Sequence, residues 1–153
     1  MKKKKKTLDT IGWREWVSFP ELGVKTIKAK IDTGARTSAL HVSNIRVSKR
    51  TNIVKFAIHP VQRKGRPVIE ASAKMVSRRE IKSSNGGLSV RPIIKTDIII
   101  GEDIFPIELA LVNRDLMGFR LLLGRSALKN RYKVNPGQSF LLMKKVKTRK
   151  GKK

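Results

Sequence analysis

The stretch VKTIKAKIDTGARTSALHV, residues 24–42, joins an alternating strand pattern to an acidic turn. Apolar and polar residues alternate up to Ile31, which is typical of a strand with one buried face. Asp32, Thr33 and Gly34 follow. This tripeptide favours a tight turn, because an Asp side chain accepts backbone N–H bonds and Gly readily adopts positive φ. By itself the tripeptide fits an ordinary turn, and a catalytic carboxylate held at a strand end is the alternative.

Strand patterns continue through the rest of the chain. Residues 101–103, Gly-Glu-Asp, are typical of the turn of a hairpin between two of these strands. One short helix is expected within the segment 125–130, with Ser126 as its N-cap. Residues 132–143 then end the domain with a turn at 136–137 and a last strand. Many short strands with one short helix predict an all-β barrel or sandwich. The other predicted strands are 52–61, 65–76, 89–100, 104–112 and 119–124.

The chain is strongly basic, with a net charge of +25 from 36 Lys and Arg against 11 Asp and Glu. Twelve of the basic residues lie in the two ends, 1–6 and 144–153, which leaves a net +13 on residues 7–143. We expect the ends to be disordered basic tails around one domain, 7–143, that is long enough for a single hydrophobic core. Such a surface attracts polyanions, including RNA, ribosomes and acidic peptides. For the tails, plain solvation is the alternative.

The sequence lacks several features, and their absence limits the cellular compartments that we expect for the protein. There is no cysteine, which excludes disulfides and thiolate metal sites and suits a reducing compartment. Asp9, Arg14 and Glu15 interrupt the segment after the basic start, so export through a signal peptide is not expected. No apolar run approaches the ~18 residues that span a membrane. We therefore expect a cytoplasmic protein without a membrane partner.

A catalytic Asp32 would need a second acid beside it. Two carboxylates a few ångströms apart share one proton, so one serves as general base to water and the other as acid to the scissile carbonyl. The chain contains one Asp-Thr-Gly, and Asp97, Asp103 and Asp115 lack its flanking sequence. A two-fold homodimer that contributes Asp32 from each subunit is therefore the expected arrangement.

The order of three motifs resembles the retropepsins. Residues 32–35 (Asp-Thr-Gly-Ala) are similar to their catalytic loop, 85–87 (Asn-Gly-Gly) to their flap, and 121–125 (Leu-Leu-Leu-Gly-Arg) to the segment before their short helix. Residues 11–142 more closely resemble a small retropepsin-like family labelled ATP-dependent zinc proteases. That family is often encoded beside ATP-grasp ligases that add glutamates to a ribosomal protein. The resemblance implies a closed acid-protease barrel, with one short helix near its C-terminal part, and an aspartic-type peptidase.

Carried onto this chain, the resemblance assigns catalysis to Asp32, with Thr33 and Gly34 fixing its carboxylate. The hairpin at 85–87 would close over substrate, since Gly permits a hinge. The residues expected to bind substrate are Ala35, Asn85, Gly86, Gly87, Arg91 and Arg125.

Neither half of the label ATP-dependent zinc protease has a matching motif. The chain has no G-x-x-x-x-G-K-[ST] loop, so a partner would supply any use of ATP. A catalytic zinc normally takes about three protein ligands, whereas this chain has two histidines, His41 and His59, and no H-E-x-x-H. We expect neither cofactor nor metal. A site made of His41, Asp32 and one further carboxylate is the open alternative.

Other polar residues allow two interpretations each. His41 is expected to be structural or solvent-facing, with a place near the cleft as the alternative. Thr37 and Ser38 either hydrogen-bond the loop that holds Asp32 or simply cap its turn. A cluster of arginines either recognises an acidic substrate through bidentate pairs or forms a solvated basic face, and the resemblance offers the further alternative that Arg125 braces the core. Its members are Arg78, Arg79, Arg91, Arg114, Arg120 and Arg125.

Two functions follow from these patterns. The leading hypothesis is an aspartic-type endopeptidase that cleaves peptide or protein substrates, including acidic or glutamate-tailed ones. The alternative is a non-catalytic basic β-barrel module that docks on a ribosome, RNA or a glutamate-modified protein. Binding of the second kind would weaken steeply with added salt.

Overall fold

The computed structural model describes residues 7–82, 86–114 and 116–142, so the predicted tails lie outside the described residues. Within these ranges strands dominate, which confirms the all-β prediction. A 3₁₀ turn, η1 (Pro20–Leu22), and one short helix, α1 (Arg125–Leu128), complete the elements. The strands are β1 (Asp9–Gly12), β2 (Arg14–Phe19), β3 (Val24–Ile31), β4 (Ser38–Val47), β5 (Ile53–Ile58), β6 (Ile69–Lys82), β7 (Leu88–Ile100), β8 (Asp103–Val112), β9 (Leu121–Leu123) and β10 (Tyr132–Asn135).

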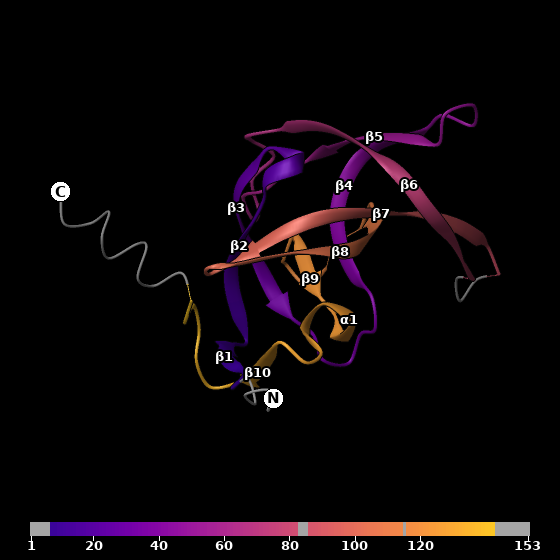
Figure 1. The fold of residues 1–153 in the computed structure, drawn as a ribbon. Coiled ribbons are helices and arrows are strands. Elements are labelled where there is room, and N and C mark those ends of the chain that lie inside the picture. The colour runs from indigo at the N-terminus through magenta and orange to yellow at the C-terminus, as the bar shows by residue number, and fades with distance from the viewer. Residues whose placement is uncertain (1–6, 83–85, 115, 143–153) are drawn as a thin grey trace, which may run out of the picture.

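Eight of the strands form one sheet that curls into a ring (Figure 1). The strand order is β2-β3-β9-β4-β5-β6-β7-β8, and β2 returns to pair with β7 through Ser18 and Ile99. β4 also runs parallel to β8, from Ser38 opposite Leu109 to His41 opposite Val112. The predicted closed barrel is therefore confirmed as a ring of strands.

The hydrophobic core fills the inside of this ring. Successive side chains of a strand point to opposite faces, so alternate residues are buried. In β8, for example, Phe105, Ile107 and Leu109 are buried, whereas Ile104 is 59% exposed. Each fully buried Leu, Ile or Phe side chain stabilises the fold by roughly 1.5–3 kcal/mol relative to its exposed state.

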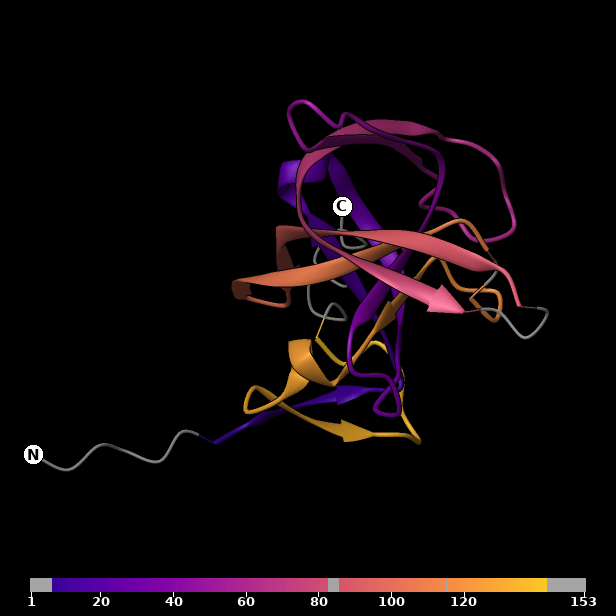
Figure 2. The same ribbon diagram turned by 90° about the vertical axis from the view of Figure 1, so that its right-hand side faces the viewer.

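A separate two-stranded sheet lies beneath the ring, where β1 and β10 run side by side (Figure 2). The fully buried carboxylate of Glu15 connects this region to the ring, because it accepts N–H groups from Gly12 at 2.7 Å, Leu141 at 2.8 Å and Leu142 at 3.2 Å. The predicted strand after the turn at 136–137 is wrong. The strand, β10, precedes that turn, and the N–H groups at 141–142 bond to Glu15 in place of a neighbouring strand.

Two further local predictions differ from the structure. Ser126 lies inside α1, and Gly124 occupies the N-cap without a side-chain bond. A side-chain cap is not needed there, because the first N–H groups of the helix donate to carbonyls of the preceding loop, as described below. The strand patterns above also do not include β1, β2 or β4. In the described part of the chain, no helix is long and apolar enough to span a bilayer.

Candidate active site

Asp32 follows the last residue of β3 and is half-buried in a loop, residues 32–37, that leads into β4. Its main-chain N–H donates to the carbonyl oxygen of Leu123 at 2.8 Å. Its Oδ1 accepts the N–H of Gly34 at 3.0 Å, and its carbonyl oxygen accepts the N–H of Ala35 at 3.2 Å. A Cβ on Gly34 would lie 3.3 Å from Oδ1, so glycine allows this close approach. The turn thus fixes the Asp32 carboxylate through its own backbone.

Strand β9 runs between the two strands that this loop connects. It pairs parallel with β3, with Ile31 opposite Leu123, and antiparallel with β4, with Leu40 opposite Leu121. Parallel pairing with β3 brings the end of β9 level with the end of β3. Asp32 therefore lies beside the exit of β9, and the contact depends on residues about ninety positions apart in the chain.

Gly124, directly after β9, lies against the backbone of the Asp32 loop. A Cβ at this position would come within 2.9 Å of the carbonyl oxygens of both Ala35 and Arg36, which is closer than such atoms approach without displacement. Its N–H donates to the hydroxyl of Ser38 at 3.0 Å, and Ser38 is fully buried. Only glycine fits this crossing without moving the loop.

The start of α1 holds the same loop from the other side. The N–H groups of Arg125 and Ser126 donate to the carbonyl oxygens of Ala35 at 2.7 Å and Arg36 at 3.0 Å. The Arg125 guanidinium donates through Nη1 to the carbonyl oxygen of Thr33 at 2.9 Å. Arg125 was predicted to bind substrate, and the structure places it as a support of the loop. Thr33 and Arg125 also line a hollow of about 400 Å³ with Leu128, Lys129, Tyr132 and Val134.

The β6–β7 hairpin reaches this loop through Arg79, whose Nη2 donates to the Thr37 hydroxyl at 3.3 Å. Arg79 lies directly opposite Arg91 in the hairpin. Burial, then the charge of Arg114, then the charge of Arg79 lower the pKa of the half-buried Arg91. Like charges at opposed positions of a sheet repel one another. The three guanidiniums therefore create a positive field beside Thr37 that favours an anion.

The predicted six-arginine cluster is not a single cluster. The charges of Arg114 and Arg79 act on Arg91 and lower its pKa, whereas Arg125 holds the loop. Arg120 donates to the carbonyl oxygens of Val61 and Lys64. Arg78 lines a separate groove. Arg78 and Arg79 are separated because neighbouring residues of a strand, here β6, point to opposite faces of the sheet.

The predicted flap glycines lie on the turn side of the same hairpin. Gly86 is exposed and has a φ of 87°, a left-handed conformation that favours glycine. Gly87 is exposed and directly precedes β7, and the predicted Asn85 lies outside the described residues.

The two histidines take part in structural contacts. His41 Nδ1 lies 2.8 Å from the carbonyl oxygen of Arg114, which ties β4 to the segment after β8. His59 bonds through Nδ1 to the carbonyl oxygen of Gly65 and through Nε2 to the Ser43 hydroxyl. Among residues 7–82, 86–114 and 116–142, no three His, Cys, Asp or Glu side chains come together as a metal site would require. These residues therefore do not fit a zinc site built from His41 and Asp32.

One known protein family matches nearly the whole chain. Residues 10–145 match the RimB-like family, described as retropepsin-like aspartic endopeptidase RimB. The chain belongs to this family. The RimB-like match confirms the predicted resemblance to retropepsin-like peptidases and the fold that the resemblance implied.

Curated relatives of this RimB-like chain carry another name. A protein of Shewanella pealeana named "Probable alpha-L-glutamate ligase" is 47% identical over 137 residues, which is 88% of this chain and 30% of that protein. One of Desulfotalea psychrophila with the same name is 40% identical over 144 residues, 93% of this chain and 31% of that protein. The chain thus spans about a third of the length of the curated relatives it matches.

A solved structure shares the fold of this RimB-like chain. The crystal structure of a protein with unknown function (DUF785) from Legionella pneumophila superposes with a TM-score of 0.73 at 24% identity. The match covers 89% of this chain and 99% of the other.

Sequence reasoning missed some residues that build the site of this RimB-like protein. In the sequence Gly124 belongs to the motif at 121–125, and its contact with the Asp32 loop was not predicted. Its signal is a glycine directly after a wholly apolar strand, which indicates close backbone approach. The bond between Arg79 and Thr37 carries no such signal, since it depends on how the hairpin folds over the loop.

Proposed function

We propose that this chain is an aspartic-type endopeptidase whose catalytic acid and base are two Asp32 carboxylates, one from each subunit of a two-fold homodimer. The observation that carries the proposal is the clamped Asp32 loop, in which Gly34 donates to Oδ1 and Leu123 accepts the Asp32 N–H. The chain has one Asp-Thr-Gly, so the second carboxylate comes from a symmetry mate. Membership of the RimB-like family supports the same class of reaction.

In this mechanism the paired carboxylates share one proton at working pH. The ionised Asp32 takes a proton from water, and the resulting hydroxide attacks the scissile carbonyl carbon. The protonated Asp32 of the other subunit gives its proton to the carbonyl oxygen, which forms a neutral tetrahedral diol. The C–N bond then breaks as the amide nitrogen takes a proton, leaving a carboxylic acid and an amine. Gly34 keeps the carboxylate in place for both roles, and the bond from Arg125 to the carbonyl oxygen of Thr33 keeps the loop in place.

The proposed substrates are acidic segments, including glutamate tails on proteins. The cluster of Arg79, Arg91 and Arg114 supports this choice, because guanidiniums bind carboxylates in bidentate geometry. The name glutamate ligase borne by the curated relatives points to the same chemical group. Binding a carboxylate would also relieve the repulsion among the three guanidiniums.

Association with RNA or ribosomes is the second candidate, favoured by the net +13 of residues 7–143 and by the basic ends. In a peptidase, this interaction would bring the enzyme to polyanionic assemblies. In a chain without catalytic activity, binding to RNA or ribosomes would be the whole function. Affinity for RNA should then fall steeply between low and high salt. Equal affinity at the two salt concentrations would contradict it.

The deciding experiment compares the native chain with Asp32→Asn on a carrier protein that ends in an oligoglutamate tail, with mass spectrometry of the products. Asp32→Asn should remove cleavage and keep the fold, because asparagine still accepts the Gly34 N–H but cannot act as the base. Asp97→Asn, a second half-buried aspartate outside the loop, should cleave normally. Cleavage by Asp32→Asn at the native rate would refute the proposal. Activity per subunit should also rise with protein concentration, as a dimer-assembled site requires.

A further inference from the structure

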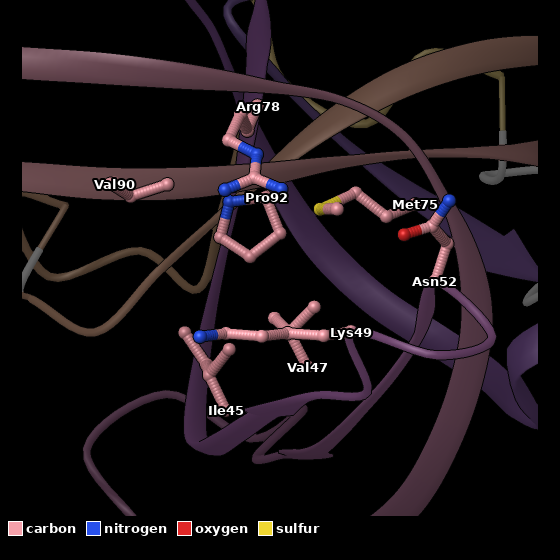
Figure 3. Close-up of a pocket in the computed structure, with 8 residues that line it drawn as sticks. All are labelled: Ile45, Val47, Lys49, Asn52, Met75, Arg78, Val90 and Pro92. Atoms are coloured by element: carbon pink, nitrogen blue, oxygen red, sulfur yellow. The ribbon is translucent and has the colours of Figure 1, made fainter.

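A groove of about 370 Å³ lies away from the Asp32 loop, between the β6–β7 hairpin and the far end of β4 (Figure 3). This volume falls within the ~300–1,000 Å³ that ligand pockets occupy. Figure 3 shows Arg78 and Pro92 on one side and Val47 and Lys49 on the other. The residues that line it are Ile45, Val47, Lys49, Asn52, Met75, Arg78, Val90 and Pro92.

The groove has an apolar floor and an exposed apolar rim. Ile45 and Met75 form the floor, where both are partly buried and pack against the core. Val47 and Val90 form the rim and remain 40% and 52% exposed. Neighbouring apolar side chains left open to water in this way mark a surface that binds a partner.

Two strand edges border the same groove. Within the described part of the chain, residues 42–47 of β4 pair with β5 alone, since the pairing with β8 ends at His41. Residues 88–92 of β7 pair with β6 alone, since the pairing with β8 begins at Ile93. Edges of this kind offer main-chain donors and acceptors to an added strand, except at Pro92, which has no N–H. The groove is therefore suited to an extended peptide.

The charge of the groove selects among possible occupants. Lys49 and Arg78 line it, and residues 7–143 as a whole carry a net +13. The segment 144–153 of this chain contains seven Lys and Arg and no acid, and a second copy of the chain is equally basic. At this groove either occupant would add positive charge beside Lys49 and Arg78, so the contact of the proposed homodimer lies on another face, whereas a segment with carboxylates would be attracted here.

We propose that this groove binds an extended segment of a partner protein in which apolar side chains alternate with Glu or Asp. In a strand, alternate side chains point to opposite faces. The apolar set would fill the floor between Ile45 and Met75, and the acidic set would face outward near Lys49 and Arg78. The site is separate from the arginines proposed to bind acidic substrate, because Arg79 and Arg91 lie on the other face of the hairpin.

Fluorescence anisotropy with a labelled octapeptide of alternating Glu and Val tests this proposal. The full chain carrying Asp32→Asn is used, so that binding is measured without cleavage and independently of the proposed peptidase. Val90→Glu should weaken binding about tenfold or more, equivalent to ~1.4 kcal/mol, because it places a charge on the apolar rim. Ile104→Glu is the matched control, since Ile104 is also an exposed strand residue, 59% accessible, and lies outside the groove.

Two further peptides define the chemistry of the site. An octapeptide of alternating Lys and Val should not bind, and the Glu-Val peptide N-methylated on alternate residues should bind at least about tenfold more weakly, because strand addition needs its N–H groups. Equal loss of affinity in Val90→Glu and Ile104→Glu would overturn the site. Binding of the Lys-Val peptide would overturn the proposed charge preference, and undiminished binding of the N-methylated peptide would overturn strand addition. Should Val90→Glu fail to fold by circular dichroism, Val47→Glu provides the same test on the opposite rim.

Discussion

The hydroxyl of Ser38 accepts the main-chain N–H of Gly124 at 3.0 Å, although 86 positions separate the two residues in the chain. Ser38 is the first residue of β4, and Gly124 directly precedes α1. Their bond joins the end of the Asp32 loop to the segment that supports it. The geometry of the proposed catalytic carboxylate therefore depends on a contact in which neither residue is itself acidic or basic.

Replacing Ser38 with alanine should lower the free energy of unfolding by ~1–3 kcal/mol, because the buried Gly124 N–H loses its acceptor. Chemical denaturation followed by tryptophan fluorescence measures this change. Ser126→Ala is the control, since Ser126 is exposed in α1, and it should shift stability by less than about 0.5 kcal/mol. Equal stability of the two variants would show that the Ser38 bond contributes nothing.

Gly124→Ala should reduce peptidase activity more than it reduces stability. The added methyl group would lie 2.9 Å from the carbonyl oxygens of Ala35 and Arg36, so the Asp32 loop must move. Misplacing a catalytic group by about 1 Å costs on the order of a hundredfold in rate. Gly65→Ala meets no atom within 4 Å and should behave as the native chain in both assays. Native activity in Gly124→Ala would mean that the loop can shift without consequence.

The phenol of Tyr132, which donates to Asp103 Oδ2 at 2.8 Å, should lose its proton only at strongly alkaline pH. Burial is the largest cause of its raised pKa, followed by the hydrogen bond to Asp103 and the charge of that carboxylate. The pKa of Tyr132 in the folded chain lies above the unfolded value of 10.0. The stability that the protonated phenol contributes to the fold is therefore complete below that pH and declines as the pH rises toward the folded pKa.

Tyrosinate absorbance measures this directly, since Tyr132 is the single tyrosine of the chain. In Asp103→Asn the pKa should fall but stay above its ordinary value, because burial remains. A native titration at the ordinary pKa of a free tyrosine would contradict the buried hydrogen bond.

Arg91→Gln should raise KM for an acidic peptide by about tenfold, close to ~1.4 kcal/mol, with a smaller effect on kcat. The reason is that Arg91 belongs to the guanidinium cluster beside Thr37, and glutamine keeps a polar side chain without the charge. Arg50→Gln, in the exposed turn after β4, is the matched control. A neutral peptide of the same length should show no change in KM for either variant. An equal rise for both peptides would indicate a structural role for Arg91 rather than recognition of carboxylates.

Local pattern predicted most of the strands and the type of fold. The alternation before Asp32 specified β3, and residues 101–103 specified the β7–β8 hairpin, whose Gly101 has a φ of 60°. These features depend on neighbours along the chain, where a side-chain period of two and the conformational freedom of glycine decide the outcome. The fold class followed from the same short-range regularities.

Long-range contacts explain where the predictions were wrong. Up to residue 142, where the described part of the chain ends, the expected strand beyond 136–137 does not form, because the buried carboxylate of Glu15, 126 positions from Leu141, takes the N–H that a strand would have used. The expected N-cap at Ser126 was wrong because the carbonyl of Ala35 already satisfies the first N–H of α1. No local pattern reports such partners, since they meet only after the chain has closed on itself.

The candidate site also combines features set by neighbouring residues with features set by long-range contacts. The sequence by itself determined that Asp32 sits in a tight turn at the end of a strand, because Asp-Thr-Gly bonds its own backbone. Only the tertiary structure decided that Gly124 and Arg125 hold this turn, and that Arg79 and Arg91 share one face of a hairpin while Arg78 faces a different groove. The physical reason is range: a turn forms from adjacent residues, whereas a clamped loop and a charge cluster require strands distant in sequence to pair in one register.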